Sequence, residues 1–396
     1  ATATASPPPW LTHRHPEVLP ERADGTRLWP GSRQAFCPSS PVYREHATAL
    51  VEALGREFGD HPALAVWHVG NEFGCHNALC YCDRSADAFR GWLRHRYGSI
   101  EALNDAWATR FWSQVYSSFD EVLPPRQAPT TVNPTQRLDF RRFSSTELLG
   151  NYRMEREVLR KLTPEVPITT NLVITPQMND VDYFAWGTEV DVVANDHYVD
   201  GADPEGYVKL AFSADLSRGV ARGRPWLLME HSTSAVNWQP RNRAKAPGEL
   251  VRNSLAHIAR GADGAMFFQW RASAAGAEKY HSAMVPHAGT DTKVWRETAG
   301  LGRTLGYLAD IAATRVDAEV ALIFDWEAWW ACELDAHPSV DVTYLDRVLA
   351  HYRAFWRRGV SVDIVPPETD LSPYRLVVVP TLYLVRDSAA DNLDRY

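Results

Sequence analysis

The chain has 396 residues, of which 45% are hydrophobic and 23% are charged, and its formal net charge is −8. This composition is typical of a globular protein large enough for more than one domain. The acidic balance disfavours nucleic acid and anionic membrane surfaces as partners, because both require a concentrated basic surface. No apolar run approaches the roughly 20 residues of a membrane span.

The first residues, ATATASPPPWL, contain neither a basic segment nor an apolar segment of the kind found in secretory signals. Five cysteines are too few for a disulfide scaffold in a chain of this size, and four of them lie before residue 83. We therefore expect a cytoplasmic protein with a local cysteine site.

Short apolar segments rich in β-forming residues alternate with segments of helical spacing along the first three quarters of the chain. The expected strands cover 1–6, 63–72, 167–173, 191–198, 225–232 and 264–273. The expected helices include 43–59, 86–98, 151–162 and 250–261. Apolar strands that alternate with helices predict a parallel sheet covered on both faces.

Polar residues recur where these expected strands end, for example Asn71 and Glu72, then Asp196, then Glu230. A (β/α)8 barrel, the TIM barrel, assembles its active site at these ends. A doubly wound sheet usually has a glycine-rich phosphate loop, and none is seen in this sequence. A barrel needs eight strands and six are visible, so we expect an incomplete barrel that starts at its third strand.

The pattern changes near residue 310. Strands are expected at 319–326, 360–366 and 375–381, with a helix at 342–359. This order predicts the beginning of a flavodoxin-like α/β domain that stops after three strands. We therefore expect a barrel domain over residues 1–310, truncated at its N-terminal side, and a truncated second domain over residues 311–396.

Two carboxylates occupy strand ends that suit glycoside hydrolysis. Glu72 and Glu230 end different strands of the expected barrel, so both side chains are expected at its mouth. Such a pair can cleave a glycosidic bond, since one group protonates the leaving oxygen while the other attacks the anomeric carbon or activates water. Asn71, beside the first carboxylate, could bind the 2-hydroxyl group of the sugar. For a single glutamate at a strand end, a structural salt bridge would be the simpler interpretation.

Three long motifs then make a resemblance specific. WHVGNEFG (67–74), MEHSTSAVNWQPRN (229–242) and FFQWRASAAGAEKYHSAMVPH (267–287) resemble the family 42 glycoside hydrolases, which are retaining β-galactosidases. The similarity extends over nearly the whole chain. It implies a TIM-barrel enzyme without an organic cofactor that acts on terminal β-D-galactosides, and a second domain that forms a homotrimer.

The resemblance also implies roles for individual residues. Glu72 would be the acid/base and Glu230 the nucleophile. Further substrate contacts would come from Asn71, Trp238, Glu278, His281, Tyr198 and Asp196. Without the resemblance, Trp238 would be interpreted as a core residue, and Glu278 and His281 as a solvated helical pair.

Alternative functions remain open at this point. Another retaining barrel glycosidase, with β-glucosidase or α-L-arabinopyranosidase activity, would differ in the sugar that Glu278 and His281 hold. An inactive carbohydrate-binding fragment is the non-enzymatic alternative, which the incomplete barrel favours and the presence of both carboxylates disfavours.

The cysteines indicate a structural zinc site beside Glu72, because zinc prefers four tetrahedral Cys or His ligands. The expected ligands are Cys37, Cys75, Cys80 and Cys82. In the resembled family, one upstream cysteine combines with C-x-C-x-x-C, and here Ser85 stands at the last position.

Cys75 is the expected substitute for that missing ligand, and His76 is a second candidate. The alternative is a set of free thiols in a loop that folds without metal. Cys332 stands alone and is expected in the core.

Overall fold

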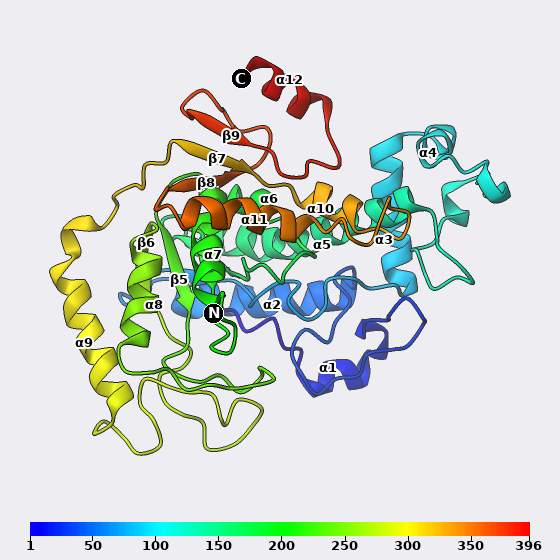
Figure 1. The fold of residues 1–396 in the computed structure, drawn as a ribbon. Coiled ribbons are helices and arrows are strands. Elements are labelled where there is room, and N and C mark those ends of the chain that lie inside the picture. Colours follow the sequence, from blue (N-terminus) through cyan, green and yellow to red (C-terminus); the bar gives the residue numbers. More distant parts are fainter.

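A computed structural model describes residues 1–396 and places two groups of parallel strands side by side (Figure 1). The first group contains β1 (Trp67–His68), β2 (Ile168–Thr169), β3 (Asn171–Leu172), β4 (Ala194–Asp196), β5 (Trp226–Glu230) and β6 (Ala262–Ala265). Their pairing follows the chain order, with β1 beside β2 and then β3, β4, β5 and β6 in succession. Because β2 and β3 are separated only by Thr170, they form one interrupted barrel strand.

This order distinguishes between the two folds considered for the first domain. A doubly wound sheet reverses its strand order at a switch point, whereas a (β/α)8 barrel adds each parallel strand next to the preceding one. All pairs in the first group are parallel and sequential. The prediction of an incomplete TIM barrel is confirmed.

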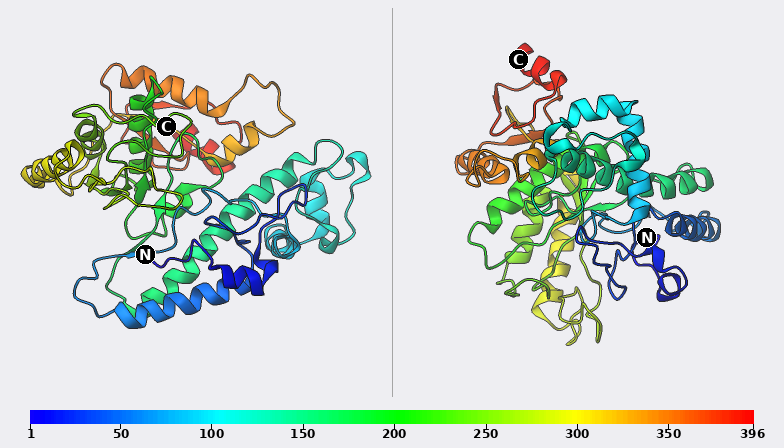
Figure 2. Two further views of the ribbon diagram at one scale, coloured as in Figure 1. Left: turned by 90° about the horizontal axis from the view of Figure 1, so that it is seen from below. Right: turned by 90° about the vertical axis from the view of Figure 1, so that its right-hand side faces the viewer.

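Helices connect and cover the barrel strands. They are α1 (Pro9–Arg14), α2 (Pro41–Phe58), α3 (Asp83–Tyr97), α4 (Ile100–Trp107), α5 (Pro134–Leu162), α6 (Tyr183–Gly187), α7 (Gly206–Val220), α8 (Glu249–Ile258) and α9 (Lys293–Tyr307). The long helices α2 and α5 lie side by side on one side of the molecule (Figure 2). Each begins with proline after a capping side chain, Ser40 or Asn133, which accepts hydrogen bonds from the first turn. None of the helices has the length and apolar character needed to cross a membrane.

Two predicted strands differ from the structure. Residues 1–6 do not form a strand, because Ala3 adopts a left-handed φ of 59° that turns the backbone out of register. Thr2 N still donates to His68 O at 2.9 Å, so the segment lies beside β1 and bonds to it at one backbone position. The segment predicted at 264–273 forms a strand only to Ala265 and continues as irregular backbone.

The second sheet contains β7 (Val320–Ile323), β8 (Val362–Val365) and β9 (Leu376–Val378), all parallel, in the order β8-β7-β9. The helices of this part are α10 (Trp326–Cys332), α11 (Tyr344–Trp356) and α12 (Asp387–Arg395). The strand order matches the first three strands of a flavodoxin-like sheet.

This sheet packs directly on barrel helix α7. A Cβ atom on Gly219 would lie 1.8 Å from the carbonyl oxygen of Ile364, so only glycine permits this approach of helix to strand. One hydrophobic cluster runs through both parts and includes Phe212 of α7 and Leu322 of β7. The division into domains at residue 310 remains a prediction.

Candidate active site

Three carboxylates meet at the C-terminal ends of the barrel strands. Glu72 follows β1, Asp196 ends β4 and Glu230 ends β5. One carboxylate oxygen from each lies within 4.8 Å of the other two. All three line a cavity of about 950 Å³, a volume that accommodates a sugar and part of its aglycone.

Asn171, the first residue of β3, connects these carboxylates. Its side-chain nitrogen donates to Asp196 at 2.6 Å and to Glu230 at 3.3 Å. Its side-chain oxygen accepts from the backbone nitrogen of Glu72 at 2.9 Å. The amide of Asn171 also donates to Asn71 at 3.0 Å, which fixes the side chain that precedes Glu72. Asn171 therefore sets the geometry of the group.

The carboxylates differ in their electrostatic environment. Burial raises the pKa of Glu230 to about 7, and the nearby charge of Glu72 acts in the same direction. A hydrogen bond of 2.7 Å from the Tyr198 hydroxyl and the charge of Arg33 oppose this rise. The pKa of Asp196 is raised by burial and by its two acidic neighbours. These raised pKa values favour a proton on Asp196 or Glu230 near neutral pH.

Arg33 forms an ion pair with Glu72, which is only 5% exposed. The backbone of Glu72 has a left-handed φ of 46°, which costs a residue with a side chain roughly 1–2 kcal/mol. Two steps earlier Gly70 has a φ of 59°. These two turns carry the chain out of β1 and point the Glu72 carboxylate into the cavity.

An aromatic wall borders the cavity. Trp238 is 54% exposed, and its ring meets the edge of Tyr198 with 5.4 Å between ring centroids. Tyr198 in turn meets His281 at 5.7 Å. The alternative of a core position for Trp238 is excluded by this exposure, and an exposed indole face suits the apolar face of a pyranose.

Two acceptors without protein partners lie on the same wall. Nδ1 of His281 faces the carbonyl oxygen of Ser282 at 2.9 Å, so this nitrogen carries the proton in the neutral ring. Burial lowers the pKa of His281 and favours the neutral form. Its Nε2 and the Oε2 of Glu278 are buried without a hydrogen-bond partner. Buried acceptors of this kind are available to hydroxyl groups of a ligand.

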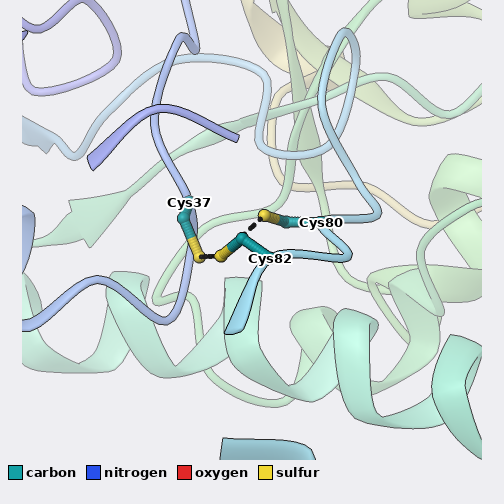
Figure 3. Close-up of side chains that lie close together, drawn as sticks. All are labelled: Cys37, Cys80 and Cys82. Atoms are coloured by element: carbon teal, nitrogen blue, oxygen red, sulfur yellow. Dashed lines mark hydrogen bonds between the residues drawn. The ribbon is translucent and has the colours of Figure 1, made fainter. Parts of the chain in front are cut away.

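Three predicted metal ligands form a buried cluster. Figure 3 shows Cys37, Cys80 and Cys82 together, with sulfur–sulfur distances of 3.4 Å (80–82) and 3.5 Å (37–82). Hydrogen bonds with Cys37 and Cys80 lower the pKa of Cys82. Four sulfurs around zinc lie about 3.8 Å apart, from Zn–S bonds of about 2.3 Å. The three thiols therefore fit one face of a zinc site.

The fourth side of this cluster is not filled by Cys75, which corrects the predicted ligand set. Ser85 lies there, with Oγ 3.2 Å from the sulfur of Cys37. Cys75 lies instead at the cavity, where its sulfur is near Glu72 and His76. Cys75 follows Glu72 by three residues and stays beside it, whereas the chain reaches the thiol cluster only at Cys80. Cys332 is buried in α10, as expected.

Two protein-family models together match nearly the whole chain. A family model described as beta-galactosidase of the glycoside hydrolase 42 family matches residues 1–308. The chain belongs to glycoside hydrolase family 42. A second model, described as the beta-galactosidase trimerisation domain, matches residues 318–396.

Relatives in this family are similar over the whole chain. A beta-galactosidase of an Arthrobacter species is 58% identical over 99% of this chain and 57% of its own length. One from Geobacillus kaustophilus is 44% identical over 100% of this chain and 58% of its own length. The crystal structure of a beta-galactosidase from Bacillus circulans sp. alkalophilus superposes with a TM-score of 0.95 at 39% identity, over 100% of this chain and 58% of that one. The chain thus spans somewhat more than half the length of these family 42 relatives.

Some residues of the family 42 site were not predicted from the sequence. Arg33 lies in an irregular loop and belongs to no motif, so only the fold reveals its ion pair with Glu72. Asn171 was visible as a polar residue at a strand end, which is the signal that could have identified it.

Proposed function

We propose that this chain carries the active site of a retaining β-galactosidase. The observation that carries the proposal is the approach of Glu72 and Glu230 within 4.8 Å, with both carboxylates at the cavity. Retaining glycosidases hold the two carboxyl groups about 5–5.5 Å apart, whereas inverting enzymes need about 6.5–9.5 Å for a water molecule between them. The names of the family 42 relatives support galactosides as the substrates.

The proposed reaction has two displacements. Glu230 attacks the anomeric carbon while Glu72 donates its proton to the glycosidic oxygen, so the glycosidic bond breaks and the aglycone leaves as an alcohol. Glu72 then takes a proton from water, and the water oxygen displaces the carboxylate of Glu230 from the sugar. Two inversions return the original anomeric configuration. The Tyr198 hydroxyl favours the charged form of Glu230, and Arg33 holds the Glu72 side chain in an ion pair.

Recognition of galactose is assigned to the wall opposite Glu72. Glu278 and His281 supply acceptors for two sugar hydroxyls, and Trp238 supports the apolar face of the ring. Because a buried acceptor without a partner is costly, an epimer that moves one hydroxyl loses binding strongly. Asn71 and Asp196 are assigned to the side of the sugar that faces Glu72 and Glu230.

The thiol cluster is proposed as a structural zinc site. Cys37, Cys80 and Cys82 would hold the ion, with Ser85 or water at the fourth position. A metal here would join the loop before α2 to the loop after Glu72. It would supply no step of the reaction.

The match of residues 318–396 to a trimerisation domain supports a homotrimer as the working assembly. It also supports two domains with a boundary near residue 310. The five cysteines are free, which favours a reducing compartment, and we assign the protein to the cytoplasm.

The test is turnover of nitrophenyl β-galactoside, β-glucoside and α-L-arabinopyranoside by the complete natural protein, with the product anomer observed by NMR. We expect the galactoside to be preferred and the β-anomer to appear first. Preference for the glucoside would reject the assigned sugar, and an α-product would reject the retaining mechanism.

A further inference from the structure

The backbone that presents Glu72 is held in an unfavourable conformation by side chains from distant parts of the chain. Glu72 has a φ of 46°, a region that residues with side chains rarely adopt. Its backbone nitrogen is fixed by Asn171 at 2.9 Å. Its carbonyl oxygen accepts from the backbone nitrogen of Cys75 at 3.0 Å, within the same turn.

Gln34 provides a second donor to the carbonyl oxygen of Glu72, from a distant part of the chain. Its side-chain nitrogen donates to the carbonyl oxygen of Glu72 at 2.7 Å and to that of Asn71 at 3.1 Å. Its side-chain oxygen accepts from the backbone nitrogen of His76 at 3.1 Å. One carboxamide thus bridges both sides of the turn from residue 71 to residue 76. Since Gln34 is only 4% exposed, water does not readily replace these bonds.

Gln34 is itself fixed by neighbouring groups. The side-chain nitrogen of Asn77 donates to the carbonyl oxygens of Gln34 and Phe36, at 3.2 and 2.6 Å. Three residues after Gln34, Cys37 enters the thiol cluster. The preceding residue, Arg33, forms the ion pair with the Glu72 side chain. Adjacent residues of one loop therefore hold the carboxylate and the backbone of Glu72.

We propose that Gln34 is a positioning residue that holds the acid/base Glu72 in its left-handed conformation and aims its carboxyl group at the glycosidic oxygen. This inference rests on the proposed function of Glu72. Gln34 acts through the backbone of Glu72 and does not take part in proton transfer.

The proposal predicts an effect that depends on the leaving group. Cleavage of a galactoside with a basic leaving group needs proton donation by Glu72, whereas a dinitrophenolate leaves without it. A misaimed Glu72 therefore slows the first substrate much more than the second. A general loss of folded protein slows both equally.

The experiment compares Gln34→Met, which keeps the side-chain volume but has no amide, with the wild type. We expect kcat/KM for methoxyphenyl β-galactoside to fall about 10- to 100-fold, because a misaimed acid loses only part of the roughly 10²- to 10⁴-fold that acid catalysis contributes. The value for dinitrophenyl β-galactoside should fall less than about 3-fold. Gln34→Glu, which places an acceptor against two carbonyl oxygens, should lose at least as much. Gln114→Met, at an exposed glutamine, is the matched control and should leave both values unchanged.

Equal loss on both substrates, or wild-type rates in Gln34→Met, would overturn the role of Gln34. If the wild-type protein itself fails to cleave any β-galactoside, the proposed function is rejected instead. A crystal structure of Gln34→Met tests the role of Gln34 even if the wild-type protein shows no activity. The proposal requires that the φ of Glu72 leaves the left-handed region in this variant.

Discussion

Replacement of Tyr198 by phenylalanine tests the electrostatics assigned to the nucleophile. The hydroxyl of Tyr198 donates to Glu230 at 2.7 Å and stabilises its carboxylate, while burial raises the pKa of Glu230 to about 7. A hydrogen bond to a charged group contributes about 1.5–3 kcal/mol, and 1.36 kcal/mol corresponds to one pKa unit. Water entering the open cavity replaces part of this bond. We therefore expect the pKa of Glu230 to rise by about 1 unit in Tyr198→Phe.

The assay is the pH profile of kcat/KM for nitrophenyl β-galactoside. A nucleophile must be ionised, so activity is lost as pH falls through the pKa of Glu230, and this acid limb should move to higher pH in the variant. Tyr307→Phe, at an exposed tyrosine, is the control and should leave the profile unchanged. An upward shift of the basic limb alone would mean that Glu230 acts as the acid, and would refute the assigned roles.

The remaining predictions concern the carboxylates and the thiols. Glu72→Gln should lower kcat for substrates with basic leaving groups about 10²- to 10⁴-fold, and azide should restore turnover of dinitrophenyl β-galactoside as galactosyl azide. Glu230→Gln should abolish turnover yet stabilise the fold above pH 7, by on the order of 2–3 kcal/mol in denaturant titration, because the raised pKa makes the ionised form unfavourable there. The wild type should contain about one zinc per chain by metal analysis, and Cys82→Ser should lose it and melt at lower temperature.

Each of these outcomes can be contradicted. Full activity in either carboxylate variant rejects the two-carboxylate mechanism. Below about pH 4, both the wild-type Glu230 and the glutamine of the variant are neutral. If Glu230→Gln still stabilises the fold there, the gain comes from packing rather than from charge. Equal melting temperatures with and without a zinc chelator would reject the metal site.

The candidate catalytic carboxylates could be predicted from the sequence because each follows directly on an apolar segment. Asn71 and Glu72 follow an apolar run, as Glu230 follows another, and a parallel barrel brings such ends together. Arg33 and Gln34 have no local signal, since their contacts to Glu72 depend on the path of a loop 38 residues earlier. The spacing of the cysteines predicted three members of the thiol cluster. It failed for Cys75 because spacing does not reveal that this residue stays at the cavity beside Glu72 and His76.

Helix α7 was not predicted, and its environment explains the omission. The helix is buried on nearly all sides between the barrel and the second sheet, so it lacks the apolar stripe by which surface helices are recognised. For residues 1–6 the error is the opposite one, because a strand was predicted that the structure does not contain. Its alternation resembles a strand, but the left-handed φ of Ala3 ends regular pairing with β1.

We propose that Glu230, not Glu72, forms the covalent bond to galactose, although burial raises the pKa of Glu230 to about 7. A 2-deoxy-2-fluoro-β-galactosyl fluoride slows hydrolysis of the intermediate and allows the labelled peptide to be sequenced by mass spectrometry. We expect one fluorosugar per chain, attached to Glu230. Label on Glu72, or inactivation without a covalent adduct, would contradict it.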